Sequence, residues 1–213
     1  MMVVDILRNP KVRKWIDRGL FLTFIGMTLW ILLFQDNTPP EEREMTWVGG
    51  PGFYDTDVLQ IAHVKDGDEL EVENFYQQRT TMRLAGVKSF AVDADHPQAA
   101  LMGQLAAKYL TEHVKGREAR LRTGHQKTDK RYRLLGRLHL LPTEADPRGG
   151  SVGLALLYEG LVMFYPTDAL AEDTLDSYRT AEQTARDAGK GLWANPQLIQ
   201  LVERMQKQWI ATP

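Results

Sequence analysis

Two short segments contain charged side chains that could act on a phosphate ester. Asp66-Gly67-Asp68 is followed about fifteen residues later by Arg83-Leu84-x-Gly86-Val87. Hydrolysis of a phosphodiester requires a Lewis acid on the phosphoryl oxygen, a group that positions or deprotonates water, and cations that stabilise the developing charge. The next residues, Lys88-Ser89-Phe90-Ala91, contain no carboxylate. This region therefore offers cations for such chemistry, but few ligands for a metal ion.

Three motifs occur in the order and spacing typical of one protein family. Arg83-Leu84-x-Gly86-Val87 is followed by Ala155-Leu-Leu-Tyr-Glu-Gly-Leu161 and by Ala181-x-x-x-Ala-x-x-Ala-Gly-Lys-Gly-Leu-Trp193. Together they resemble the staphylococcal nuclease family over roughly residues 58–195. The resemblance implies an α+β fold, a five-stranded β-barrel of the oligonucleotide/oligosaccharide-binding (OB) type with about three helices.

The resemblance also implies positions for a calcium-dependent active site. The family holds calcium with two aspartates, and uses a glutamate and two arginines. By position, Asp68 matches the first aspartate, and Arg83 and Arg133 match the arginines. The second aspartate and the glutamate fall on Lys88 and Ala91. Calcium favours six to eight hard oxygen ligands, so an ammonium group here disfavours binding, and Lys88 could instead pair with Asp68.

Other family positions have changed as well. An Asn-Glu pair of the family reads Gly153-Leu154, and its Tyr-Gly-Arg approach to the second arginine reads Arg131-Tyr132-Arg133. Loss of that glycine is expected to re-aim the loop. We therefore expect a degenerate site with no active catalytic residues, no metal and no cofactor.

Replacement ligands are the alternative to a lost site. Asp93 and Asp95 follow Ala91 closely, with His96 adjacent, and if the enzyme were active Asp68 and Asp93 would be the candidate calcium ligands. The competing interpretation, which we favour, is that Asp95 or His96 caps a helix that begins near Pro97.

The rest of the chain predicts the elements that would carry these residues. We expect strands at 57–65, 69–73, 79–87, 118–122 and 134–141, a helix from Pro97, and helices at 152–161 and 173–188. These elements assign residues 57–195 to the nuclease-like domain, preceded by a linker at 36–56 that is rich in Pro, Gly and acidic residues.

One long apolar run, Gly19 to Phe34, precedes the linker. Its sixteen uncharged residues would rise roughly 24 Å as a helix, near the lower limit for a bilayer span. We predict a transmembrane helix at 19–35, rather than a cleaved signal peptide or a core helix. The basic segment 1–18 and the acidic residues after the run place the N-terminus on the cytoplasmic or matrix side and the large domain on the opposite side, with the mitochondrial inner membrane favoured.

Composition limits the partners. The chain has 213 residues, 26 Lys and Arg against 28 Asp and Glu, and no cysteine. The balance argues against a dedicated nucleic-acid binder, and the lack of cysteine excludes disulfides and thiolate sites. A local excess of cations runs from Lys108 to Arg137. It is either a solvated or docking face, which we favour, or an anion patch centred on Lys127, Lys130, Arg131 and Arg133.

Residues 196–213 are expected to form an amphipathic helix. Leu198, Val202, Met205 and Trp209 recur on one face. This stripe would pack either on its own domain or on a partner protein, and the sequence does not decide between them.

Three functions remain in view. The favoured hypothesis is a single-pass membrane protein with an inactive nuclease-like domain, serving as a structural or accessory subunit of a membrane complex. The alternative is a membrane-tethered, calcium-dependent nuclease for DNA or RNA. A third is a non-catalytic tether for nucleic acid or anionic lipid.

Overall fold

The computed structural model describes residues 52–167 and 170–211. The predicted basic segment 1–18, the transmembrane helix 19–35 and linker residues 36–51 lie outside this range. Within the described residues, no helix has both the length and the apolar character needed to span a bilayer.

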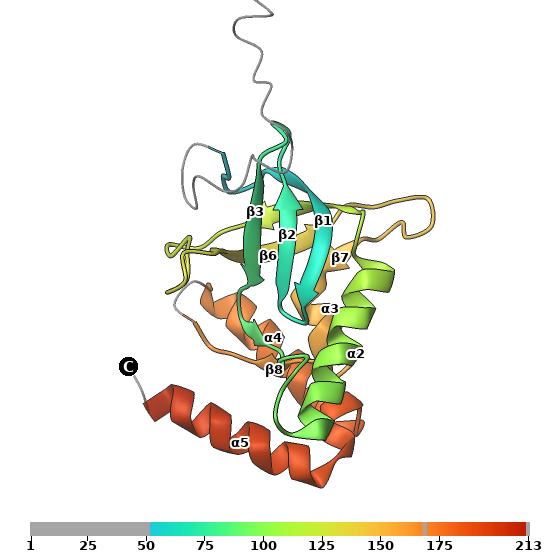
Figure 1. The fold of residues 1–213 in the computed structure, drawn as a ribbon, viewed down its shortest axis with the longest axis vertical. Coiled ribbons are helices and arrows are strands. Elements are labelled where there is room, and N and C mark those ends of the chain that lie inside the picture. The colour runs from blue at the N-terminus through green and yellow to red at the C-terminus, as the bar shows by residue number, and fades with distance from the viewer. Residues whose placement is uncertain (1–51, 168–169, 212–213) are drawn as a thin grey trace, which may run out of the picture. The chain divides into compact units, whose positions relative to one another are not determined.

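Five strands form the barrel predicted from the resemblance (Figure 1). They are β1 (Val58–Asp66), β2 (Glu69–Glu73), β3 (Arg79–Leu84), β5 (Glu118–Arg122) and β6 (Leu134–Leu140). Neighbours pair in the order β3-β2-β1-β5-β6, and a parallel pairing of β3 with β6 closes the sheet on itself. The short strand β7 (Gly150–Ser151) extends β6.

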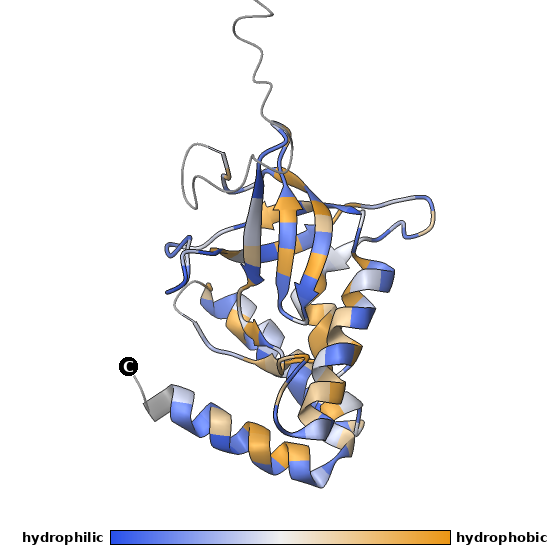
Figure 2. Cartoon of the chain, in the orientation of Figure 1, coloured by the Kyte–Doolittle hydropathy of each residue, from blue (hydrophilic) through white to orange (hydrophobic). Residues whose placement is uncertain are grey.

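Alternating apolar residues fill the barrel. Leu59 and Ile61 of β1 and Leu70 and Val72 of β2 have essentially no exposed surface. Since successive side chains of a strand point to opposite faces, the residues between them face outward and are polar or small (Figure 2). The barrel interior is therefore a packed core.

The prediction of one strand at 79–87 is wrong in one respect, because this segment contains parts of two strands. β3 ends at Leu84, and β4 (Val87–Lys88) pairs with the unpredicted β8 (Met163–Phe164) in a second small sheet. Gly86 causes the break with a φ of +82°, and a Cβ there would lie 2.4 Å from a methyl of Leu170. Only glycine adopts this conformation readily.

Four α-helices lie beside and beyond the barrel. They are α2 (Pro97–His113), α3 (Val152–Tyr158), α4 (Glu172–Asp187) and α5 (Pro196–Ala211), with a 3₁₀ turn η1 (Gly191–Ala194) before α5. His96 is the N-cap of α2 but makes no side-chain capping bond. The predicted side-chain cap is therefore wrong, and the fixed φ of Pro97 at the first turn favours helix initiation instead.

Helix α5 packs on its own domain. Leu198 and Val202 are buried in a cluster with Met102, Leu192 and Trp193, and Met205 and Trp209 are partly buried against the same cluster. Of the two alternatives for this helix, packing on the domain itself accounts for the whole apolar stripe.

Candidate functional site

The family's active-site positions line one cleft of about 490 Å³. It lies where β2 begins, where β3 ends and where the loop before β6 approaches them. The cleft contains five cations and four carboxylates, namely Arg83, Lys88, Lys130, Arg131 and Arg133 against Asp66, Asp68, Glu69 and Asp129. The fold thus brings the predicted residues together, but their charges nearly balance.

Asp68 is the centre of the first charge cluster. The residue is 3% exposed, and its Oδ2 lies 3.3 Å from Nζ of Lys88 and 3.7 Å from Nε of Arg83. The same oxygen accepts a hydrogen bond from the Ser89 backbone N–H at 3.2 Å. Oδ2 of the one carboxylate matching the family's calcium site is therefore already engaged by groups of its own domain.

Local backbone structure fixes Asp68 and Lys88 against each other. Asp68 follows the β1–β2 turn, and its carbonyl accepts the Leu84 N–H at the end of β3. Lys88 is held by the pairing of β4 with Met163 of β8. A Cβ on Gly67 would lie 2.2 Å from Ser89 Oγ, so the absence of a side chain there lets the two segments approach.

Arg133 is the centre of the second cluster. Its guanidinium donates to both Asp129, at 2.8 Å from Nε, and Glu69. Burial raises the pKa of Asp129, but hydrogen bonds from Arg133 and from the Arg131 N–H together hold this pKa below its usual value. The arginine thus lines the cleft with both nearby carboxylates already bound.

In the loop before Arg133, a tyrosine has a backbone conformation that glycine adopts more readily. Tyr132 has a φ of +60°, in the left-handed region, and its side chain is 75% exposed. The tyrosine adopts this strained conformation, and Arg133 lines the cleft. Left-handed backbone costs a non-glycine residue about 1 kcal/mol.

The sequence analysis missed one aromatic residue of this region, Tyr165, and did not predict that Trp209 would lie beside it. Tyr165 lines the cleft, and the Arg83 guanidinium lies 5.4 Å from its ring centre. The Trp209 ring of α5 packs edge-on against the Tyr165 ring, with ring centres 4.8 Å apart. No family motif identified Tyr165, and only the folding back of α5 brings Trp209 to it.

The residues present do not fit calcium. Among the described residues no group of three His, Cys, Asp or Glu side chains could hold a metal ion. Ala91 lines the cleft without offering a ligand, and the replacement candidates Asp93 and Asp95 are exposed and do not line it. Calcium prefers several oxygen ligands, whereas Asp68 meets an ammonium and a guanidinium.

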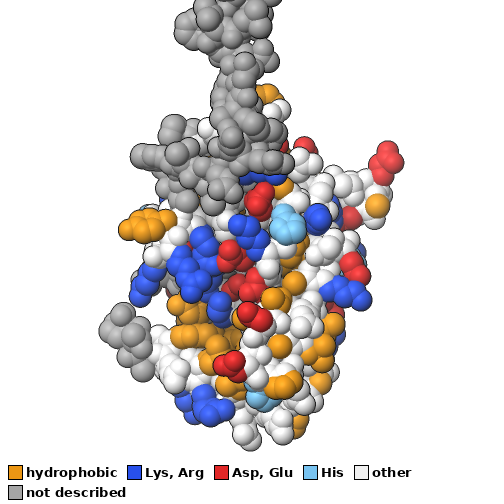
Figure 3. Space-filling view, in the orientation of Figure 1, with side chains coloured by type: hydrophobic (Ala, Val, Ile, Leu, Met, Phe, Trp, Pro, Cys, Tyr) orange, Lys and Arg blue, Asp and Glu red, His pale blue; other side chains and the backbone are white. Residues whose placement is uncertain are grey.

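The residues of the predicted anion patch differ in whether they form ion pairs. Arg133 is paired, while no ion-pair partner is found within the described chain for Lys127, Lys130 or Arg131, and all three are exposed. Figure 3 shows basic and acidic side chains gathered side by side on this face. This surface therefore carries both charges, and some of its cations have no ion-pair partner among the described residues.

Comparison with known families agrees with this geometry. The model of the family described as staphylococcal nuclease homologue matches residues 81–195. This chain belongs to that family. The matched residues include Arg83, Lys88, Arg133 and α4, whereas Asp68 precedes them and is added to the site by the fold. No curated protein matches the chain.

Proposed function

We propose that this member of the staphylococcal nuclease family is a catalytically inactive, membrane-anchored protein that serves as a structural or accessory subunit of a membrane complex. The observation that carries the proposal is the contact of Lys88 with Asp68, 3.3 Å between Nζ and Oδ2. An ammonium fixed on the remaining carboxylate supplies locally the charge that a metal would otherwise supply. Such a pair favours the apo form of the site.

The anchor and the compartment belong to the same proposal. The apolar run from Gly19 to Phe34, with basic residues before it and acidic residues after it, supports insertion with the domain on the trans side. The mitochondrial inner membrane is the compartment that we propose. Neighbouring subunits of a membrane complex are the proposed partners, and nucleic acid is not.

A calcium-dependent nuclease is the second candidate, favoured by one observation. Asp68, Arg83 and Arg133 still line a single cleft. If Lys88 moved away, these residues would retain part of the family's constellation. The pairing of Arg133 with Asp129 and Glu69 argues against this candidate, because both carboxylates would have to release it.

Nuclease assays on the full chain purified in detergent separate the two candidates. We expect no calcium-dependent cleavage of single- or double-stranded DNA. The variant Lys88→Asp combined with Ala91→Glu restores both missing carboxylates, and it is expected to bind calcium in a calorimeter where the parent does not. Calcium-dependent cleavage by the parent that is abolished by Asp68→Ala would show that the protein is an enzyme.

Purification from native membranes tests the accessory role. The full chain should migrate with other membrane proteins in a mild detergent. A chain that migrates alone, in the membrane fraction, would contradict the proposed role in a complex while leaving the anchor intact.

A further inference from the structure

The turn between β2 and β3 exposes two adjacent aromatic side chains. Phe75 is 90% and Tyr76 72% exposed, and their ring centres are 5.6 Å apart. Most large apolar side chains of the described domain are buried or half-buried. A pair this exposed indicates a contact surface, because single apolar residues are common at protein surfaces but adjacent large ones are not. We call residues 74–78 the aromatic turn.

A hydrogen-bond network holds the aromatic turn in one shape. Asn74 is 7% exposed, and its Oδ1 accepts the backbone N–H groups of Tyr76 and Gln78, each at 3.0 Å. Its Nδ2 donates to Oε1 of Gln78 and to the Gly52 carbonyl. Gln77 completes the turn with a φ of +60°. The aromatic rings therefore project from an ordered base, and little conformational entropy remains to be lost on binding.

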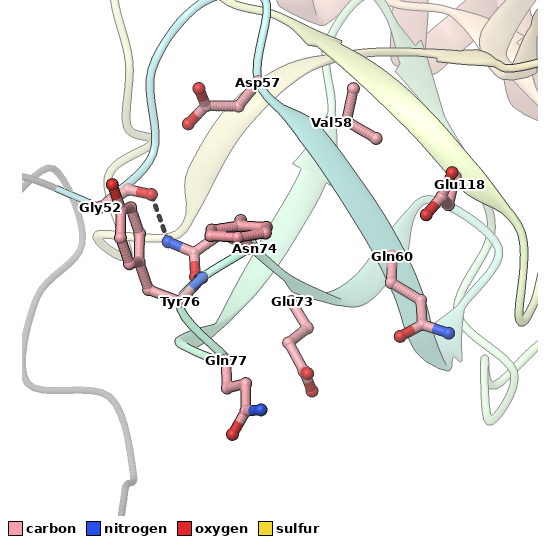
Figure 4. Close-up of a pocket in the computed structure, with 10 residues that line it drawn as sticks. Gly52, Asp57, Val58, Gln60, Glu73, Asn74, Tyr76, Gln77 and Glu118 are labelled. Atoms are coloured by element: carbon pink, nitrogen blue, oxygen red, sulfur yellow. Dashed lines mark hydrogen bonds between the residues drawn. The ribbon is translucent and has the colours of Figure 1, made fainter.

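A pocket of about 370 Å³ adjoins the aromatic turn and is acidic. Figure 4 shows Asp57, Glu73 and Glu118 placed around it, with Tyr76 at its edge. Among the described residues that line this pocket there is no Lys or Arg. Glu73 is bound by Arg79 from outside the pocket, whereas the Glu118 carboxylate has no ion pair within the described chain. The pocket is suited to a cation flanked by aromatic rings.

We propose that the aromatic turn and its acidic pocket contact the headgroup layer of a bilayer with choline-bearing, zwitterionic lipids. Tyrosine and other amphipathic aromatic side chains are favoured at the membrane interface. A quaternary ammonium is attracted both by aromatic faces and by carboxylates. The same carboxylates repel anionic headgroups, so the site selects for lipids whose outer group is cationic.

This inference rests on the proposed membrane anchor. Gly52, whose carbonyl binds Asn74, is the residue through which the chain enters the described domain. Sixteen residues, 36–51, separate it from the predicted transmembrane helix at 19–35, and such a segment spans at most about 55 Å when extended. The tether therefore allows the aromatic turn to reach the bilayer in which the anchor would sit.

The absence of cysteine from the chain permits a direct test. In the full-length chain, Gln77→Cys places a unique thiol on the aromatic turn and Asp95→Cys places one on the exposed loop before α2, away from the turn. Each is labelled with an environment-sensitive fluorophore and reconstituted in phosphatidylcholine vesicles that contain a nitroxide lipid. We expect stronger quenching and a blue-shifted emission at position 77 than at position 95. The added changes Phe75→Ser and Tyr76→Ser should abolish this difference.

The outcomes separate the proposal from its premise. Resistance to carbonate extraction reports the anchor itself, so loss of the protein from vesicles refutes the anchor. Retention with equal quenching at positions 77 and 95 overturns the lipid contact alone. Quenching at position 77 that is as strong in phosphatidylglycerol as in phosphatidylcholine overturns the choline preference. Protection of position 77 in native membranes but not in vesicles would assign the aromatic turn to a protein partner instead.

Discussion

The side chains at the two ends of the β2–β3 hairpin differ in whether they bind other groups of the domain or project into solvent. At one end, where Glu69 pairs in register with Arg83, the cleft holds charged residues that bind one another. At the other end, beyond the paired Glu73 and Arg79, Phe75 and Tyr76 project into solvent. Five residues of strand separate the two ends, roughly 17 Å.

The difference lies in which side chains bind groups of their own domain and which remain exposed. In the cleft, Asp68 and Arg133 each form ion pairs with charged side chains of their own domain. In the aromatic turn, by contrast, the rings of Phe75 and Tyr76 are largely exposed. Removing cleft residues should therefore reduce stability, and removing the rings should reduce only binding. The following predictions test this contrast, beginning with the largest effect.

Asp68→Ala should have the largest effect. It leaves the Arg83 and Lys88 charges and the Ser89 N–H without their shared acceptor, and breaking a buried ion pair in this way costs about 3 kcal/mol. Urea unfolding followed by circular dichroism measures it. The control Asp68→Asn keeps an acceptor for Ser89 and should lose less. Equal stability of Asp68→Ala and the parent would show that the cleft is not internal structure.

Asn74→Ala should be next, at the opposite end of the hairpin. It leaves two backbone N–H groups of the aromatic turn and the Gly52 carbonyl without their partner, at a cost of about 2 kcal/mol. The same unfolding experiment applies, and Asn74→Asp, which keeps the acceptor oxygen, is the matched control. A loss below that of Asn74→Asp would contradict the role of the network.

Replacement by glycine should stabilise the loop before Arg133, at Tyr132, and the aromatic turn, at Gln77. Tyr132 and Gln77 each have a φ of +60°, and replacing either by glycine relieves left-handed strain, with a net gain of less than about 1 kcal/mol after the entropy of glycine is subtracted. Thermal unfolding should show a small increase in midpoint for each. A decrease for Tyr132→Gly would indicate that the exposed tyrosine ring contributes to the loop.

The cleft should also show a pH dependence. Burial raises the pKa of Asp66, a shift that the Gly67 N–H opposes and that nearby Asp68 reinforces. Asp66 then binds more protons in the folded than in the unfolded state just above the usual aspartate pKa, so its contribution to stability is lost as the pH rises through the folded pKa. Asp66→Asn should flatten this slope just above the usual aspartate pKa in unfolding experiments. An unchanged slope would contradict the assignment to Asp66.

Phe75→Ser with Tyr76→Ser should have the smallest effect on stability. Both side chains are largely exposed, so the double change is expected to alter the free energy of unfolding by less than about 0.5 kcal/mol. Denaturant unfolding checks this while the vesicle experiment reports binding. A loss as large as that of Asn74→Ala would mean that the rings support the turn.

The barrel could be predicted because its signals are local. Alternating apolar residues define β1 and β2, and Arg83, Gly86 and the closing motif at 181–193 are specific to the family. The short strands β7 and β8 could not be predicted, since two-residue strands carry no periodicity. The break after β3 was missed because a glycine within an apolar run signals a bend only when its φ is known.

The site could be predicted by position but not by contact. The sequence analysis grouped Asp68, Arg83, Lys88, Ala91 and Arg133, and all five line one cleft. The family match covers four of them, because Asp68 precedes the matched residues 81–195. The sequence could not reveal that Asp129 and Glu69 bind Arg133, because the Glu69 contact depends on how the loop before β6 lies against the start of β2. Phe75 and Tyr76 were also missed, since nothing in a two-residue aromatic pair distinguishes a buried turn from an exposed one.

The amino-acid sequence by itself determined the family and the barrel class, because these depend on residue identity and order. Only the tertiary structure decided that the remaining cleft charges bind one another, that α5 packs on its own domain and that the aromatic turn is exposed. These features depend on which groups meet at distances of a few ångströms. Such distances are set by chain closure across the barrel, not by spacing along the chain.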